Sequence, residues 1–339
     1  MTAPEVEPAL ADLMDTVFAD YRRSSASPGT GLDSDFWRRL DELGLVRLTG
    51  AEQAGGSGAG WYETTELLTA AVRHGVRIPL AEHDLLACWV LESAGAQVDE
   101  AVRTVCLLDQ AGAASGVPWA SSADRIVVMW QREGDYLAVD AEPGKISISA
   151  GANMIGEPRD TVIADLGSLA GIPVAGDVVT KLRLKSALVR SIQVCAALDE
   201  ALALSIDHVS SREQFGRPLS KFQAVQHLIA DIAAEAALAR SATEAALSAA
   251  VLSDWSAPHL EFLVAAARSC AGHAASAVVR DAHQLHGAIG TTREHRLHEF
   301  TRAALAWRSE YGSMRYWDDR VTDMALQAGP NKLWSLINP

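Results

Sequence analysis

Apolar residues follow two different periods along this chain of 339 residues. In most of the chain they recur every three or four positions, the spacing that places them on one face of a helix. The three long C-terminal segments, 186–210, 220–253 and 258–286, are rich in alanine, and small side chains let helices pack closely. We expect a further helix, which begins near Thr292, to complete a bundle of four with them. The segments with this helical spacing are 5–22, 34–43, 61–77, 80–93, 186–210, 220–253 and 258–286.

The pattern changes between about 103 and 182, where short β-prone runs are separated by turn signals such as Glu142-Pro143-Gly144. We therefore predict a small, mostly antiparallel β domain inside a mainly α-helical protein. The expected order is an N-terminal helical domain, a reduced β domain and a C-terminal four-helix bundle, at 1–102, 103–182 and 183–339. The β-prone runs are 125–130, 136–139, 145–149 and 161–164.

A glycine-rich stretch, A-E-Q-A-G-G-S-G-A-G at 51–60, lies between two predicted helices. Glycine-rich loops that bind dinucleotides follow a strand of a βαβ unit. No such strand precedes this stretch, so we reject a dinucleotide-binding fingerprint. We expect a flexible connection between helices instead.

Composition excludes several classes of function. Hydrophobic residues make up 49% of the chain and charged residues 21%, so the chain can bury a sizeable core. The net charge of −14 argues against a nucleic-acid partner, which needs a basic surface, although a local basic pocket for an anionic ligand remains compatible with it. No apolar run approaches the ~18 residues of a membrane helix, and the acidic N-terminus lacks the apolar core of a signal sequence.

The four cysteines are far apart in the sequence and form no C-x-x-C motif. Zinc-binding and redox motifs of that kind are therefore not expected. Buried free thiols fit a reducing compartment, so we expect the protein in the cytoplasm. The cysteines are Cys88, Cys106, Cys195 and Cys270.

A helix break at 211–226 (S-R-E-Q-F-G-R-P-L-S-K-F-Q-A-V-Q) joins the first two long helical segments of the C-terminal part. Gly216 allows backbone angles that other residues avoid. The bend brings together Arg212, Gln214 and Phe215. The Arg212 guanidinium could hold a phosphate oxygen, and the Phe215 ring could pack against a flat ligand. From the residues alone, a helix hairpin with an ordinary charged end explains the segment as well.

This bend and a second segment resemble two motifs of the acyl-CoA dehydrogenase family. The bend matches R-x-Q-F-G-x-P-L-x-x-F-Q, and Gln284–Gly290 (Q-L-H-G-A-I-G) matches Q-x-x-G-G-x-G, with Ala288 in place of the second glycine. The two motifs come in the family's order and at about its spacing. The resemblance implies that the chain helps to bind FAD through Arg212, Gln214, Phe215, Gly216, Gln284, Gly287 and Gly290.

Members of this family remove two hydrogens from the α and β carbons of an acyl-CoA. A carboxylate, usually a glutamate, takes the α proton while a hydride passes to the flavin. The family places that glutamate at one of two positions, which correspond here to Ser186 and Tyr311, and neither residue is an acid. Glu310 precedes Tyr311 and is the remaining candidate base. A solvated carboxylate at a helix end is the alternative interpretation of Glu310.

The β segment also departs from the family. It is short and lacks the family's A-x-T-E-P-x-x-G-S-D motif, which packs on the flavin ring and the substrate. Val117-Pro118-Trp119 resembles only a divergent version of it. The resemblance therefore leaves the usual wall of the flavin site undefined.

The missing base and the short β segment resemble one chain of the actinobacterial α2β2 dehydrogenases that act on bulky steroid-CoA thioesters. In those assemblies one chain supplies the base. The implied partners are an acyl-CoA substrate, a second acyl-CoA dehydrogenase-like chain and an electron-transfer flavoprotein. Two alternatives stay open, namely a homo-oligomeric dehydrogenase that uses Glu310 and a non-catalytic structural subunit.

One further group of residues has metal-ligating side chains. His295 and His298 are three positions apart, with Glu294 and Glu299 beside them. No third ligand is evident from the spacing, and a charged helix face accounts for the same residues. We expect no metal site.

Overall fold

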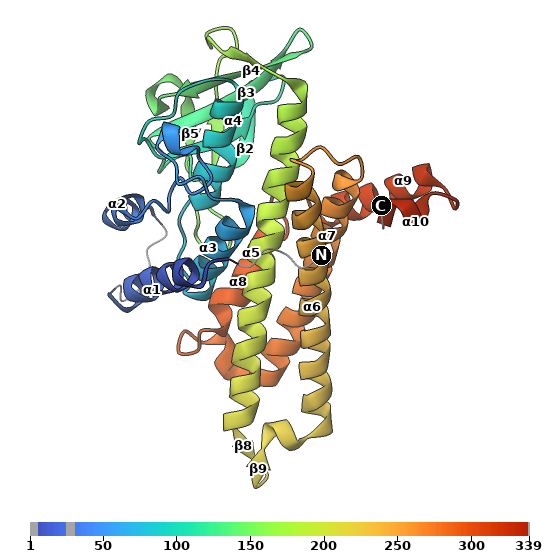
Figure 1. The fold of residues 1–339 in the computed structure, drawn as a ribbon. Coiled ribbons are helices and arrows are strands. Elements are labelled where there is room, and N and C mark those ends of the chain that lie inside the picture. Colours follow the sequence, from blue (N-terminus) through green and yellow to red (C-terminus); the bar gives the residue numbers. More distant parts are fainter. Residues whose placement is uncertain (1–5, 25–30, 338–339) are drawn as a thin grey trace. The chain divides into compact units, whose positions relative to one another are not determined.

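The structure, a computed structural model, describes residues 6–24 and 31–337 (Figure 1). The absence of a signal sequence was inferred in part from residues 1–5, which lie outside the described residues. Contacts divide the chain into two compact units, residues 1–186 and 187–339. The boundary falls inside one helix of 36 residues, α5 (Gly176–Ser211), which begins ten residues earlier than expected. The division into three domains stays a prediction.

The first unit begins with helices. α1 packs against α3, and Arg73 on α3 binds Asp15 on α1 with an Nη1–Oδ1 distance of 2.8 Å. Asp33 caps α2, because its carboxylate accepts hydrogen bonds from the backbone N–H groups of Asp35 and Phe36. The helical segments are α1 (Pro8–Ser24), α2 (Ser34–Glu42), η1 (Glu52–Ala54), α3 (Trp61–Arg73), the π-helix η2 (Ala81–Cys88) and α4 (Trp89–Ser93).

The glycine-rich stretch is more ordered than expected. Its backbone folds back on the preceding residues, with Ser57 N–H donating to Arg47 O at 3.0 Å and Gly58 N–H donating to Gly50 O at 2.9 Å. A Cβ on Gly56 would lie 2.1 Å from Gly50 O, so the two backbones can approach only because Gly56 has no side chain. The expectation of a flexible connection was wrong.

The predicted small β segment lies in the first unit, where it forms two small sheets. One sheet has the order β1-β3-β4-β7, with β1 and β3 parallel and the other pairs antiparallel, and the second is antiparallel with the order β2-β6-β5. The central strand β3 is buried along Ile126–Trp130, so its apolar run is continuous rather than alternating. The strands are β1 (Arg103–Leu107), β2 (Ala113–Pro118), β3 (Arg125–Arg132), β4 (Asp135–Ala141), β5 (Ser147–Ser149), β6 (Arg159–Ile163) and β7 (Ile172–Val174).

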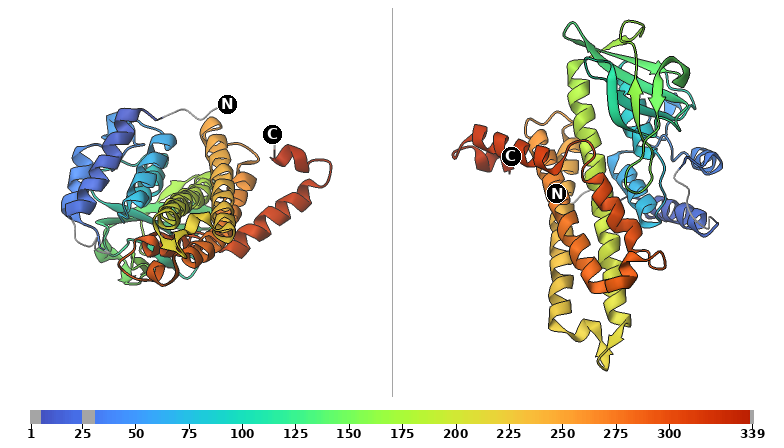
Figure 2. Two further views of the ribbon diagram at one scale, coloured as in Figure 1. Left: turned by 90° about the horizontal axis from the view of Figure 1, so that it is seen from below. Right: turned by 180° about the vertical axis from the view of Figure 1, so that it is seen from behind.

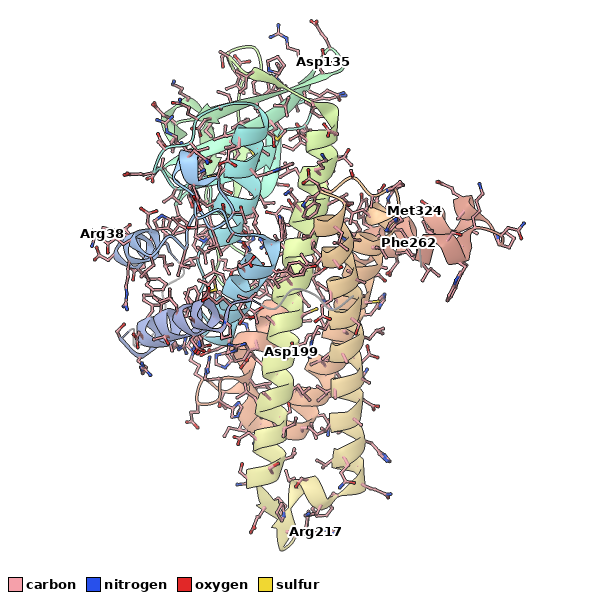
Figure 3. The ribbon with its side chains drawn as sticks, viewed as in Figure 1. Arg38, Asp135, Asp199, Arg217, Phe262 and Met324 are labelled. Carbon is pink, nitrogen blue, oxygen red and sulfur yellow. The ribbon has the colours of Figure 1, made fainter. Side chains whose placement is uncertain are left out.

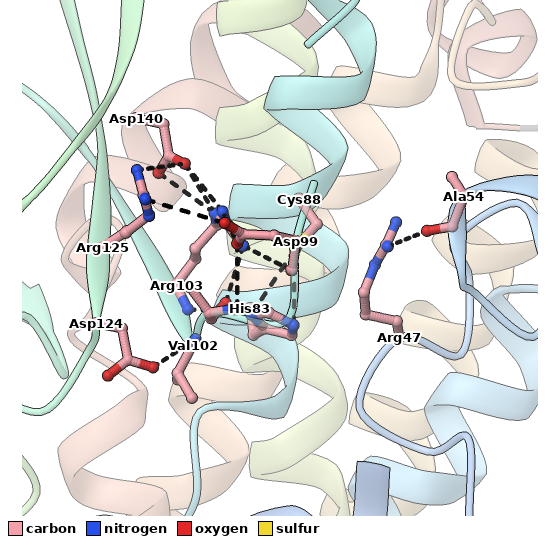
Figure 4. Close-up of polar contacts among 11 residues, drawn as sticks. Arg47, Ala54, His83, Cys88, Asp99, Val102, Arg103, Asp124, Arg125 and Asp140 are labelled. Carbon is pink, nitrogen blue, oxygen red and sulfur yellow. Dashed lines mark hydrogen bonds and ion pairs between the residues drawn. The ribbon is translucent and has the colours of Figure 1, made fainter. Parts of the chain in front are cut away.

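A buried polar joint connects the helices of this unit to the first sheet (Figure 4). Arg103 is 1% exposed, and its guanidinium binds the carboxylates of Asp140 and Asp99. Its backbone N–H donates to Nδ1 of His83 in η2 at 3.1 Å. Burial and the nearby positive charges lower the pKa of His83 to about 3, so this imidazole is neutral. The joint ties η2 to β1 and explains why helices and sheets form one unit.

The second unit consists of the C-terminal part of α5 and the helices that follow it (Figures 1 and 2). α6 packs along α7, and α5 is tied to α6 by a contact of 3.4 Å between Cys195 Sγ and Thr243 Oγ1. α8 closes this group, as expected, but begins at Leu297 rather than near Thr292. The remaining elements are β8 (Glu213–Gln214), β9 (Arg217–Pro218), η4 (Leu219–Lys221), α6 (Gln223–Leu252), α7 (Leu260–His286), η5 (Gly287–Thr291), α8 (Leu297–Trp307), α9 (Met314–Ala328) and α10 (Leu333–Ile337).

One helical segment corrects the sequence analysis, which found no stretch apolar enough for a membrane. The segment Leu260–Thr291 is long enough and has a mean hydropathy of 1.4, because alanine raises the average over its most apolar window. More than half of that window, 56%, is buried, and α7 packs against α6, α8 and α9. These contacts are those of a central helix in a globular unit.

Candidate functional site

The bend after α5 is a hairpin whose tip projects into solvent. Phe215 (φ 54°) and Gly216 (φ 78°) form its two-residue turn between β8 and β9, with the left-handed angles that such turns require. The Phe215 side chain is 91% exposed. Arg217, labelled in Figure 3, directly follows this turn, and its guanidinium lies 4.1 Å from the centre of the Phe222 ring. The four candidate residues of the first motif, Arg212, Gln214, Phe215 and Gly216, are all exposed on one hairpin.

The second motif forms the end of α7 and the short helix η5. Gly287 has φ 62° and ψ −142°, a conformation that side chains disfavour, and it ends α7. A Cβ on Gly290 would lie 2.8 Å from the Cβ of His286, so only glycine fits there without displacement. Gln284, Gly287 and Ala288 are exposed, which leaves this corner open to a ligand.

Three histidines bring the two motifs together within the second unit. His208 lies one turn before Arg212, and its ring stacks on that of His286, with 4.4 Å between the ring centres. The ring of His295, in the loop before α8, lies 4.6 Å from that of His286 and 6.1 Å from that of His208. We call these three residues the histidine cluster. The family motifs are therefore neighbours in space, although about seventy residues of sequence separate them.

The histidine cluster is uncharged at neutral pH. Burial lowers the pKa of His286 to about 4, and the same cause lowers the pKa of His208 and of His295. Nδ1 of His286 donates to Ala282 O at 2.7 Å, which places the lone pair on Nε2. That Nε2 is buried and has no hydrogen-bond partner among the residues that the structure describes.

The candidate base Glu310 lies elsewhere in this unit, in the loop between α8 and α9. Its carboxylate accepts a hydrogen bond of 2.7 Å from Nε of Arg190 on α5, and the Arg190 side chain is 1% exposed. Arg190 also donates to Gln193 Oε1 at 2.6 Å and lies 5.1 Å from the centre of the Tyr311 ring. Tyr311, at the family's glutamate position, and Glu310 before it therefore both contact the buried guanidinium of Arg190.

A second buried arginine holds the same loop. Nη2 of Arg268, on α7, donates to the backbone oxygens of Arg308 at 2.9 Å and of Glu310 at 2.8 Å. Burial and the nearby Arg190 lower the pKa of Arg268 to about 10, which still leaves it charged at neutral pH. Two buried guanidinium groups thus hold this loop, Arg190 through the Glu310 carboxylate and Arg268 through backbone oxygens.

This arrangement makes Glu310 a poor general base. A base must become protonated, and a protonated Glu310 would leave the buried Arg190 without its counter-charge. Breaking a buried ion pair in this way costs about 3–5 kcal/mol. The geometry favours a structural role for Glu310, different from both interpretations that the sequence left open, because its side chain is only 15% exposed.

The other family position for the base contains no acid either. Ser186 is the last residue of the first unit, and its hydroxyl donates to Leu182 O at 2.8 Å. Its neighbour Lys185 is buried between two indole rings, with Nζ 4.9 Å from the centre of Trp61 and 4.4 Å from that of Trp89. Aromatic faces stabilise such an ammonium group. A buried ammonium group therefore lies beside Ser186, the family position for the base.

The divergent segment Val117-Pro118-Trp119 does not form an open wall. Trp119 is 2% exposed and its backbone N–H donates to Pro158 O at 3.2 Å. Val117 belongs to the core between the two sheets. In this conformation the segment packs inside the first unit and offers no surface to a ring.

Sequence reasoning missed Arg190, Arg268 and His208. A signal existed for Arg190, since it is a lone charge within the apolar run Ala187–Ile192. Arg268 also interrupts an apolar helix face. His208 gave no signal, because its partners follow 78 and 87 positions later and no motif connects them.

The residues of the second unit fit FAD in two respects. The exposed hairpin combines a guanidinium, an amide and an open backbone at Gly216, where a Cβ would meet nothing within 4 Å. The corner at Gly287 presents a backbone that only glycine adopts easily. These are features that a pyrophosphate and a flat ring can use.

Comparisons with known proteins agree with these observations. Residues 171–314 match the family model described as "Acyl-CoA dehydrogenase, C-terminal domain". FadE34, an acyl-CoA dehydrogenase of Mycobacterium tuberculosis, is 27% identical over 314 residues, which cover 88% of this chain. The chain spans only 43% of the length of FadE34.

Two solved structures share the fold. The ChsE4–ChsE5 complex of Mycobacterium tuberculosis contains a chain with a TM-score of 0.84 and 21% identity, and the match covers 97% of this chain and 99% of that one. The Tcur3481–Tcur3483 steroid ACAD contains a chain with a TM-score of 0.82 and 21% identity, covering 94% and 97% respectively.

Proposed function

Because the chain belongs to the acyl-CoA dehydrogenase family, a family of oxidoreductases acting on CH–CH bonds, we propose that it is one subunit of a heteromeric, FAD-dependent acyl-CoA dehydrogenase. A second acyl-CoA dehydrogenase-like chain supplies the catalytic base. The observation that carries this proposal is the pairing of Glu310 with the buried Arg190, together with the absence of an acid at Ser186 and Tyr311.

This chain's own contribution is to bind and orient. Arg212 and Gln214 would hold the pyrophosphate, with Phe215 and Gly216 beside them on the same exposed hairpin. Gln284, Gly287 and Gly290 would approach a flavin from the corner after α7. FAD, when bound, accepts the hydride from the β carbon of the acyl group. The α proton would leave to a carboxylate of the partner, since this chain has no free acid at either family position.

The substrate class follows from the relatives. The Tcur3481–Tcur3483 protein is described as a steroid ACAD, and a chain of it has this fold. We infer a bulky, possibly steroid-derived acyl-CoA as substrate, α,β-dehydrogenation as reaction and an electron-transfer flavoprotein as acceptor of the electrons. The free thiols, three of which are buried, support a place in the reducing cytoplasm.

The test is the FAD content per chain together with the native mass. Both are measured for this chain alone and after co-expression with a candidate acyl-CoA dehydrogenase-like partner chain that has the family's glutamate. We expect flavin only in the mixed complex, at one FAD per pair of chains. Turnover of the complex should then be lost when a glutamate of the partner is changed to glutamine, and should persist in Glu310→Gln.

The two other outcomes support other functions. One flavin per chain in a homo-oligomer whose turnover disappears in Glu310→Gln would support an independent enzyme. That outcome contradicts the heteromer and the assignment of Glu310 given above. A mixed complex without flavin would leave a structural subunit that keeps the fold.

A further inference from the structure

The histidine cluster joins three segments that are far apart in the sequence. His208 lies in the last turns of α5, His286 ends α7, and His295 precedes α8. Each offers one ring nitrogen, and these atoms lie within 4.8 Å of one another. None of the three is needed for the proposed binding of FAD by the two motifs, so the cluster lacks an assigned role.

The hydrogen bonds of the cluster single out one nitrogen as a ready ligand. Nδ1 of His286 donates to Ala282 O, which fixes the lone pair on Nε2. His286 is 5% exposed, and this Nε2 is buried without a hydrogen-bond partner. An imidazole held through Nδ1–H by a backbone carbonyl, with a free Nε2, is the usual arrangement of a histidine that binds a metal.

We propose that His208, His286 and His295 bind one divalent late transition-metal ion, Zn²⁺ in the cell. Three imidazole nitrogens without thiolate or carboxylate suit Zn²⁺, Cu²⁺, Ni²⁺ and Co²⁺ rather than Mg²⁺ or Ca²⁺. Three protein ligands leave a fourth position for water or an anion. The lowered pKa values of the three imidazoles keep them unprotonated, as ligands must be.

The rings must close around the ion. Nitrogens bound to one Zn²⁺ at about 2.0–2.1 Å lie roughly 3.3 Å apart, closer than the 4.8 Å of the present arrangement. His208 is half-buried near the helix end, so its ring can turn out of the stack on His286. His295 would exchange one contact, the 3.1 Å hydrogen bond that its Nδ1 accepts from Leu297 N–H. His286 is already in position.

The structure also separates this site from the pair considered in the sequence. His298 is not part of the histidine cluster, and its Nδ1 donates to His295 O at 2.7 Å. Bound metal would fasten the end of α5 to the corner after α7. Its role is therefore structural, and it does not depend on whether the chain binds FAD or catalyses a reaction.

The test uses the full-length chain without a histidine tag, together with its partner if the two co-purify. Zn²⁺ affinity is measured by competition with a chromophoric chelator, and Co²⁺ is added as a spectroscopic probe. We expect one Zn²⁺ per chain and visible Co²⁺ absorption. His208→Ala and His286→Ala should each weaken Zn²⁺ binding by more than about 10-fold. Removing a residue that only supports a metal ligand already costs about 10–100-fold in affinity, so removing a ligand should cost at least as much.

Two histidines of the same unit serve as matched controls. His227→Ala removes an exposed imidazole of α6, and His298→Ala removes the imidazole beside the cluster. Both should bind Zn²⁺ like the wild type. Circular dichroism verifies that each variant folds. If His286→Ala does not fold, the Zn²⁺ affinities of His208→Ala and His295→Ala test the site instead. Equal affinity in all variants, or no Zn²⁺ binding by the wild type, would overturn the site, whatever the flavin content.

Discussion

Two regions along α5 differ in which family features they retain. At the end of α5, His208 and Arg212 belong to the region that keeps the family's flavin motifs. Eighteen positions earlier, about 27 Å along the helix axis, Arg190 belongs to the region where the family's base is missing. The first region carries the exposed hairpin and has uncharged histidines at its centre, whereas the second is buried and rich in positive charge.

The difference fits the proposal that this chain shares one function with a partner chain. Binding motifs must stay if a cofactor is still held. A catalytic carboxylate can be replaced, and the space it leaves is then filled by groups that stabilise the fold. Arg190 and Arg268 organise the loop 307–312 in this way, through Glu310 and through backbone oxygens. The comparison therefore separates residues that should affect stability from residues that should affect flavin.

The largest effect should come from Glu310. Glu310→Ala removes the counter-charge of the buried Arg190, so the free energy of unfolding should fall by about 3–5 kcal/mol. Glu310→Gln should cost less, because its amide oxygen can still accept from Arg190. Urea denaturation measures both changes, and turnover per bound flavin in the complex should stay near the wild-type value.

The exposed Glu294 gives the control. Glu294→Ala should change the stability by no more than about 0.5 kcal/mol. If Glu310 were the base, Glu310→Gln would lower turnover by about 10²–10⁴ while leaving the fold stable. That result would contradict the structural role of Glu310, and the two regions could no longer be contrasted as one that binds flavin and one that stabilises the fold.

The second effect concerns acid, and it belongs to the histidine cluster. The pKa of His286 is lowered to about 4 in the folded chain, below the usual 6.5 of the unfolded chain. The unfolded state therefore takes up its proton first as the pH falls, and stability is lost between pH 6.5 and about 4. At about 1.4 kcal/mol per unit, the full loss for His286 is at most roughly 3 kcal/mol, and solvent screening lowers it.

Urea midpoints measured in EDTA from pH 8 to pH 4 test this prediction for the metal-free chain. His286→Gln should flatten the decline, because its side chain does not titrate. The wild type should still be as stable at pH 7 as at pH 8. An equally steep decline in the variant would assign the acid sensitivity to other groups, such as the buried His83 of the first unit.

The third effect is that of a methyl group at the corner after α7. Gly287→Ala places a side chain at φ 62° and ψ −142°, which should cost about 1–3 kcal/mol and lower the FAD content of the complex. Thermal unfolding and flavin absorbance measure the two changes. Gly144→Ala is the control, because Gly144 has no neighbour within 4 Å and no positive φ. Full flavin content in Gly287→Ala would remove this corner from the proposed site.

The sequence predicted what is encoded locally. Helical and strand periods gave the helices and the β segment, and two contiguous motifs located the exposed hairpin and the corner after α7. The fold was confirmed, and residues 171–314 match the family's C-terminal-domain model, whereas the role of the motif residues in binding FAD stays a prediction. α8 begins later than expected, because His295 accepts a hydrogen bond from Leu297 at its start, an interaction that no period reveals.

The rest could not be predicted, because it depends on contacts between distant residues. Arg190 and Glu310 are 120 positions apart, and only their contact shows that the remaining acid is neutralised. The three histidines of the cluster come from separate segments, so the sequence pointed instead to the adjacent pair His295 and His298. Val117-Pro118-Trp119 resembled a divergent form of the family motif that packs on the flavin, but long-range packing buries Trp119.

The smallest effect on stability, and the sharpest test of the exposed region, should come from Phe215. Its side chain is 91% exposed, so Phe215→Ala should change the free energy of unfolding by less than about 0.5 kcal/mol. The same change should lower the FAD content and the yield of the mixed complex, because the ring is proposed to pack on a ligand or partner. Trp334→Ala is the matched control, since Trp334 is 71% exposed on α10, outside both motifs. Equal FAD content in both variants would mean that the hairpin is an ordinary helix connection. The two regions would then differ in solvent exposure alone and not in a role in binding FAD.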